Sequence, residues 1–199
     1  MIGFSGVILA GGLSRRMGQD KRGVTVGGET LFNRVLRVYE SIFSEIIIVV
    51  AEHSPFTENL RHKVVTDIIP QKGPLGGLYT GLSYSTEPCV FMVACDMPFL
   101  SSSLIRRLCD MSLNFDVLMV QLQTGVQPMQ GVYSKKCLPV LKRMIDTNHL
   151  EMRDIVSNSE LVPRIVDQED VKDLDPNFIS FMNVNTPADL EMANKFSGS

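Results

Sequence analysis

Short apolar runs rich in β-branched residues alternate along the chain with stretches that have helical character. Gly6–Ala10, Ile46–Ala51 and Val90–Ala94 are typical of strands, and the unbroken apolarity of the last two indicates burial on both faces. Glu29–Phe43 carries an apolar stripe at helical spacing, and Leu75–Ser85 is predicted as a helix opened by the Gly-Pro pair before it. This alternation predicts an α/β fold in which helices cover both faces of a mostly parallel sheet.

The rest of the chain continues the same alternation. At about 150 residues per domain, and with no internal repeat, low-complexity tract or linker, the sequence predicts a single domain spanning residues 1–199. Residues 148–178 have the weakest periodicity. The further elements predicted are strands at Val64–Val65, Val117–Val120, Met129–Tyr133 and Leu161–Val166, and helices at Leu104–Met111, Lys135–Asp146 and from Pro187 onward.

The composition is that of an ordinary globular protein, with 44% hydrophobic and 21% charged residues. Nineteen basic and 22 acidic residues give a net charge of −3, so we expect no nucleic-acid partner. The apolar start is too short for a membrane span and lacks the positive charge of a signal peptide, so we expect no membrane association. The four cysteines lack metal-site spacing, which favours free thiols and a cytoplasmic location.

A loop rich in glycine and basic residues follows the first predicted strand directly. Gly11 and Gly12 allow backbone N–H groups to surround an anion, and Arg16 and Lys21 add positive charge nearby. The spacing fits neither a Walker A loop nor the GxGxxG pattern. Because binding sites in such sheets lie beyond the carboxyl ends of the strands, this loop is predicted to hold a polyphosphate.

An aspartate at the exit of a buried strand is the second candidate. Asp96 follows Val90–Ala94 and precedes Pro98, which stops the strand. Such an aspartate is often an ordinary turn residue. Beside a phosphate-binding loop, however, it is a candidate Mg²⁺ ligand, because Mg²⁺ prefers one or two protein carboxylates together with substrate phosphate oxygens.

Three further segments are weaker candidates. Asp67 follows a short strand, and Gly76 and Gly77 either let a base or ribose approach the backbone or belong to a plain helix N-terminus. Asn183 and Asn185 could ligate the metal, contact a second substrate or cap the final helix. The segment 127–131 is predicted either as a loop on the side of the acceptor substrate (an acceptor-side loop) or as an edge strand with a bulge.

Four segments in order make the chain similar to a known family. Leu9–Lys21, Gly73–Gly77, Cys95–Pro98 and Asn183–Pro187 resemble the motifs of the molybdenum cofactor guanylyltransferases, called MobA. The first motif by itself is typical of the wider nucleotidyltransferase group, whereas the four together are specific. The resemblance extends from Leu9 to about residue 190.

The resemblance implies a Rossmann-like nucleotidyltransferase that joins GMP from GTP to the terminal phosphate of Mo-molybdopterin and releases pyrophosphate. It also implies a transient partner, because such enzymes pass their product to a molybdoenzyme or its chaperone. Asp96 would bind GTP and Mg²⁺, and Asp67 would belong to the nucleotide site. The backbone of Leu9, Ala10 and Gly11 would contact the nucleotide, and Lys21 its phosphates.

The chemistry needs positioning and charge neutralisation more than a general base, because a phosphate oxygen is already a competent nucleophile. Lys21 and Arg16 are therefore expected to stabilise charge on the α-phosphoryl group and the leaving pyrophosphate. By an ungapped match, Val49 occupies a place where the family has an asparagine. This departure leaves open a cytidylyltransferase or a sugar- or alcohol-phosphate nucleotidyltransferase of the same fold. A nucleotide-binding cofactor chaperone without catalysis is the third alternative.

Overall fold

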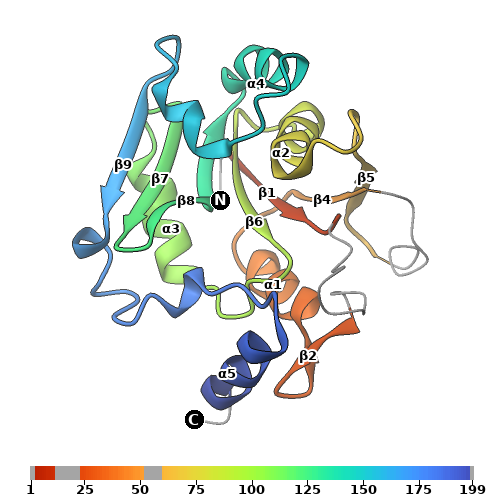
Figure 1. The fold of residues 1–199 in the computed structure, drawn as a ribbon, viewed down its shortest axis with the longest axis vertical. Helices are drawn as coiled ribbons and strands as arrows, with labels where there is room; N and C mark the ends of the chain where they lie inside the picture. The colour runs from red at the N-terminus through yellow and green to blue at the C-terminus, as the bar shows by residue number, and fades with distance from the viewer. Residues whose placement is uncertain (1–2, 12–22, 52–59, 198–199) are drawn as a thin grey trace.

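The computed structural model describes residues 3–11, 23–51 and 60–197. Its centre is a seven-stranded sheet in the order β5-β4-β1-β6-β8-β7-β9 (Figure 1). Neighbouring strands are parallel except where β8 pairs with β6 and β7, so the predicted mostly parallel α/β fold is confirmed. The strands are β1 (Phe4–Leu9), β4 (Ile46–Val50), β5 (Lys63–Thr66), β6 (Cys89–Ala94), β7 (Val117–Leu122), β8 (Gly125–Ser134) and β9 (Pro163–Asp167).

Helices lie on both faces of this sheet. The strands and helices predicted from the sequence are present, with ends that differ by a few residues. Residues 148–178, where periodicity is weak, contain short 3₁₀ turns besides β9. The helices are α1 (Leu31–Glu40), α2 (Gly73–Tyr84), α3 (Ser102–Met111), α4 (Cys137–Asp146) and α5 (Pro187–Ser197), with 3₁₀ turns η3 (Met152–Ser157), η4 (Gln168–Asp170) and η5 (Ile179–Phe181).

A small hairpin that the sequence pattern did not predict precedes α1. It consists of β2 (Thr25–Val26) and β3 (Glu29–Thr30), joined by Gly27 and Gly28, both with positive φ. The predicted start of the first helix at Glu29 is therefore wrong. The Thr30 side chain accepts a hydrogen bond from the Asn33 N–H at 3.2 Å and caps the helix, which begins one residue later.

The two faces of the sheet carry separate apolar cores. Leu78 of α2 and Leu141 of α4 are fully buried in one core together with Val7 of β1. Tyr39 of α1 and Leu104 of α3 are fully buried in the other. Because β1, β4 and β6 are covered on both sides, these strands consist largely of apolar residues.

The four cysteines are free thiols, and Cys95, Cys109 and Cys137 are buried. Burial raises the pKa of Cys137 to about 12, so this thiol stays protonated at neutral pH. Among the described residues, no helix is both long enough and apolar enough to cross a membrane.

Strand β8 departs from the expected edge position. It lies between β6 and β7, so the edge-strand alternative for residues 127–131 is wrong, whereas the bulge is present. Leu118 of β7 pairs with Val132 and Val120 pairs with Gln127, so β8 contains extra residues between these pairs. The Tyr133 hydroxyl donates to the Pro128 carbonyl at 2.6 Å and fixes the bulge.

Gln130 lies within this bulge and is fully buried, and neither of its side-chain amide atoms has a hydrogen-bond partner among the described residues. Gln130→Met should raise the free energy of unfolding by about 1 kcal/mol, because methionine has a similar shape and no polar atoms to desolvate. Urea unfolding would measure this. Gln127→Met is the control and should give no gain, since Gln127 donates to the Gly125 carbonyl at 2.9 Å. Destabilisation by Gln130→Met would mean that Gln130 has a bound partner.

Candidate active site

A cavity of about 360 Å³ lies beyond the carboxyl ends of four parallel strands, β5, β4, β1 and β6. This is the edge at which α/β sheets bind ligands, and three of the four sequence motifs contribute to its wall. Most of the wall is apolar, and its polar side chains come from the loop after β5 and the exit of β6. It is lined by Leu9, Gly11, Val49, Ala51, Asp67, Gln71, Gly73, Pro74, Gly77, Ala94, Cys95, Asp96 and Met129.

The end of β1 brings backbone into this cavity. The Leu9 carbonyl accepts from the Cys95 N–H at 3.0 Å, and the Ala10 N–H donates to the Val49 carbonyl at 2.8 Å. The Leu9 carbonyl and the Ala10 N–H therefore already have hydrogen-bond partners on the neighbouring strands. A Cβ on Gly11 would lie 2.9 Å from the Ala51 backbone nitrogen. Glycine is therefore required there by close backbone approach. The rest of the motif, including Gly12, Arg16 and Lys21, lies outside the described residues.

Asp96 occupies the position predicted for it. It lies two residues after the last residue of β6, it is 7% exposed, and it lines the cavity. Its carbonyl accepts a hydrogen bond from the Val184 N–H at 2.9 Å. This bond ties the segment that contains Asn183 and Asn185 to the strand exit, so the third and fourth motifs are neighbours in space.

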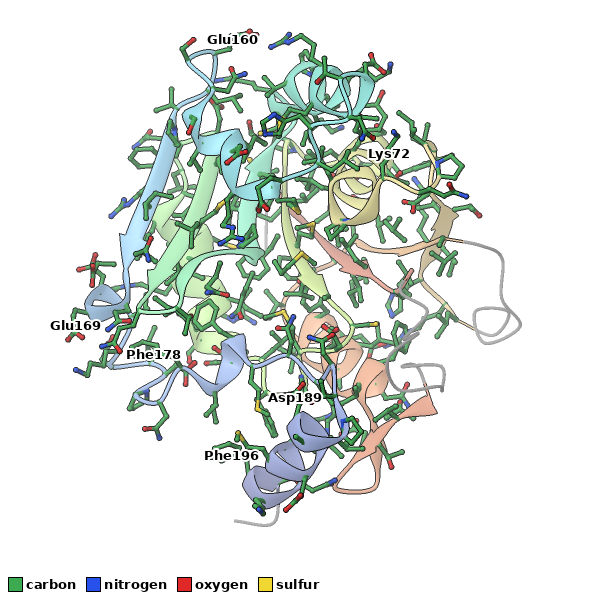
Figure 2. All side chains as sticks on the ribbon, in the orientation of Figure 1. Lys72, Glu160, Glu169, Phe178, Asp189 and Phe196 are labelled. Carbon is green, nitrogen blue, oxygen red and sulfur yellow. The ribbon has the colours of Figure 1, made fainter. Side chains whose placement is uncertain are left out.

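Thr186 and Asp189 form the helix cap near the C-terminus. The Thr186 hydroxyl accepts from the Asp189 N–H at 3.2 Å, and the Asp189 carboxylate accepts from the Thr186 N–H at 2.8 Å. This reciprocal pair caps α5, and Figure 2 shows Asp189 at the start of that helix. Asn185 contributes its backbone N–H to the same carboxylate. The cap that the sequence offered as one role for Asn183 and Asn185 is thus supplied by Thr186 and Asp189.

Asp67 begins the loop between β5 and α2 and is half-buried at the cavity wall. Its N–H donates to the Val50 carbonyl at 3.0 Å. The Thr80 hydroxyl of α2 donates to Asp67 Oδ1 at 3.4 Å and accepts from the Ile68 N–H at 3.0 Å. Burial raises the pKa of the Asp67 carboxyl above its ordinary value, while the bond from Thr80 opposes this shift.

Because its pKa is raised in the folded state, ionised Asp67 destabilises the fold above that pKa, and this effect disappears as the pH falls below its unfolded pKa of about 3.9. Asp67→Asn should therefore raise Tm at pH 7, and the gain should vanish near about pH 3. Calorimetric melts at both pH values would measure this. Asp110→Asn, an exposed carboxylate on α3, is the control and should change Tm much less. An equal gain at both pH values would contradict the prediction.

The two glycines predicted to admit a base or ribose differ in position. Gly77 lines the cavity, and a Cβ there would lie 2.8 Å from Leu9 Cδ2. Gly76 is buried, and a Cβ there would lie 2.8 Å from Lys72 Cβ, away from the residues that line the cavity. Close packing explains why glycine occupies both positions. At Gly77 the missing side chain also leaves space at the cavity wall.

Two wall residues were not singled out from the sequence. Gln71 and Ala51 line the cavity although no motif pointed to them. Met129 also lines the cavity, and it belongs to segment 127–131, for which the sequence offered an acceptor-side loop as one alternative. Gln71 has a positive φ of 62°, which the sequence does not reveal for a residue other than glycine. Val49, the departure from the family pattern, lies inside β4, is 2% exposed and presents an apolar side chain to the cavity.

Comparisons with known proteins agree with this arrangement. The family model described as the MobA-like NTP transferase domain matches residues 6–163. A protein from Pelotomaculum thermopropionicum, named probable molybdenum cofactor guanylyltransferase, is 36% identical over 196 residues, covering 97% of this chain and 93% of that protein. Molybdopterin-guanine dinucleotide biosynthesis protein A from Archaeoglobus fulgidus has a similar structure, with a TM-score of 0.87 and 22% identity over 98% of each chain.

A Mycobacterium tuberculosis protein solved as a complex with manganese also shares the fold, with a TM-score of 0.68 and 16% identity over 97% of this chain and 98% of that one. The resemblance inferred from four ordered motifs and the nucleotidyltransferase fold that it implied are thus confirmed. The family match covers most of the chain and includes three of the four motifs in full. The chain therefore belongs to the MobA-like NTP transferase family.

Proposed function

We propose that this nucleotidyltransferase transfers GMP from GTP to the terminal phosphate of Mo-molybdopterin, giving molybdopterin guanine dinucleotide and pyrophosphate. The observation that carries the proposal is the cavity itself. Its wall is largely apolar, which suits a flat base, and it includes the buried carboxylate of Asp96 at the carboxyl edge of a parallel sheet. The names of the relatives supply the identity of the nucleotide and of the acceptor.

In this reaction an oxygen of the acceptor phosphate attacks the α-phosphorus of GTP. The bond from that phosphorus to the bridging oxygen breaks, and pyrophosphate leaves with the electron pair. Ala10 and Gly11 hold the nucleotide through backbone groups at the end of β1. Lys21 and Arg16 neutralise the charge that develops on the α-phosphoryl group and on the leaving pyrophosphate.

The residues present fit a divalent cation, which we propose to be Mg²⁺. Asp96 offers a carboxylate at the cavity wall, and among the described residues no cluster of three or more His, Cys, Asp or Glu side chains could hold a metal by itself. One protein carboxylate completed by phosphate oxygens is a common arrangement for Mg²⁺. When bound, the cation would neutralise phosphate charge, and Asp96 would hold and orient it.

The acceptor would enter from the side of Asn183 and Asn185. The Val184 N–H bond to the Asp96 carbonyl holds these two residues next to the strand exit, which is where the acceptor phosphate must meet the α-phosphorus. Amide side chains suit such a role because they donate to phosphate and pterin oxygens and also accept hydrogen bonds. We assign both asparagines to acceptor binding.

We further propose that the chain acts as one domain over residues 1–199, because a single sheet contains strands from Phe4 to Asp167. The product would pass to a molybdoenzyme or its chaperone through a transient contact. The free thiols suit work in the cytoplasm.

Calorimetric binding of GTP, CTP, ATP and UTP, each with and without Mg²⁺, is the direct test. The proposal expects GTP to bind best and to require Mg²⁺, and it expects pyrophosphate release once Mo-molybdopterin is added. Tightest binding of CTP would change the product to a cytosine dinucleotide. GTP binding without pyrophosphate release would favour a cofactor chaperone, and no nucleotide binding at all would overturn the assignment.

A further inference from the structure

The polar side chains of the cavity wall come from two places that lie apart in the sheet. Asp67 follows β5 and Asp96 follows β6, and these strands are separated in the sheet by β4 and β1. At about 4.8 Å between neighbouring strands, the two exits are about 14 Å apart. If Asp96 meets the phosphates, the loop after β5 faces the base.

Gln71 is the second polar side chain that this loop presents to the cavity. It is exposed, and its amide makes no hydrogen bond with the described part of the chain. Its φ of 62° lies in the left-handed region, which costs a residue other than glycine or asparagine about 1 kcal/mol or more. The neighbouring Lys72, labelled in Figure 2 at the start of α2, instead donates to Asn148 Oδ1 at 3.0 Å.

We propose that Gln71 is a specificity-determining residue that reads the base of the nucleotide by donating from Nε2 to O6 of guanine. This inference rests on the proposed function, because it takes GTP as the bound nucleotide. Gln71 thereby supplies the amide that the apolar Val49 lacks, from another part of the wall of the same cavity.

The hydrogen-bonding edge of guanine fits this pair of side chains. Guanine presents one acceptor, O6, and two donors, N1–H and the N2 amino group. The Asp67 carboxylate accepts from the two donors, and the Gln71 amide donates to the acceptor. Cytosine presents two acceptors, O2 and N3, and these would face the Asp67 carboxylate and be repelled. The loop therefore selects guanine over cytosine.

Gln71→Gly removes the amide without backbone strain, because glycine adopts a positive φ freely. Wild type should bind GTP about tenfold more tightly than 6-thio-GTP, in which sulfur replaces O6 and accepts hydrogen bonds only weakly. The variant should bind both nucleotides with similar affinity, because its affinity for GTP falls. Its preference for GTP over inosine triphosphate, which lacks the N2 amino group, should be unchanged because Asp67 is intact.

Asn148→Gly is the matched control, since Asn148 is also exposed with a positive φ, of 55°, and does not line the cavity. It should leave all three affinities unchanged. Gln71→Glu keeps the shape and replaces the donor by a carboxylate oxygen, so it should weaken GTP binding more than 6-thio-GTP binding. Equal weakening of both nucleotides in the Gln71 variants, or no weakening, would overturn the role of Gln71 and leave the proposed function intact. Tighter binding of CTP than of GTP by wild type would instead overturn the proposed function.

Discussion

Asp96→Asn is expected to lower kcat for GMP transfer by about 10²-fold or more, because it removes one electrostatic stabiliser of the transition state. The side chain is 7% exposed at the cavity wall, so bulk water cannot replace its charge. Asparagine keeps the size of the side chain and removes its charge, which weakens its hold on a divalent cation. Pyrophosphate release at saturating GTP and Mg²⁺ would measure the loss.

Asp116→Asn provides the matched control for this variant. Asp116 is also a buried carboxylate, with 5% of its surface exposed. It precedes β7, whereas Asp96 follows β6. Because β7 runs parallel to β6, Asp116 lies at the edge of the sheet opposite to Asp96. It accepts from Ser134 and from the Val162 N–H, so its replacement should lower Tm while leaving kcat unchanged. Near wild-type kcat in folded Asp96→Asn would remove Asp96 from the mechanism.

The strands at the centre of the fold were predictable because burial on both faces leaves a direct mark on their sequence. β4 is Ile46–Val50 without a polar residue, and β6 is nearly as apolar. Since parallel strands end at one edge, the residues after them, Asp67 and Asp96, could be assigned to one site from the order of the strands along the chain. The tertiary contact between Asp96 and Val184 could not, because it joins positions far apart in the chain.

Other features depend on backbone geometry that the sequence encodes weakly. β2 and β3 are two residues each, too short for an alternating pattern, although the Gly27-Gly28 pair is itself a turn signal. Pro128 suggests an edge strand, yet the bulge accommodates it inside the sheet. Gln71 reaches the cavity wall through a positive φ, and no residue pattern predicts that conformation for glutamine.

The position of α2 against β1 shapes the cavity and explains another glycine. A Cβ on Gly81 would lie 2.6 Å from Val7 Cγ1 and 2.9 Å from Val7 Cγ2. The stiff branched side chain of Val7 is fully buried and cannot move aside. One turn earlier on the helix, Gly77 approaches Leu9 in the same way, so α2 lies close to the strand that leads into the first sequence motif.

Gly81→Val should therefore lower the free energy of unfolding by about 3 kcal/mol, since overpacking of a dense core outweighs the gain of about 0.5 kcal/mol in helix propensity. Urea unfolding would measure the loss. It should also weaken GTP binding, because lifting α2 shifts the wall that carries Gly77 and Pro74. Val7→Ala makes room for the added side chain, so the double variant should be more stable than the sum of the single effects by about 1 kcal/mol or more. Strict additivity would show that Gly81 is retained for a reason other than its contact with Val7.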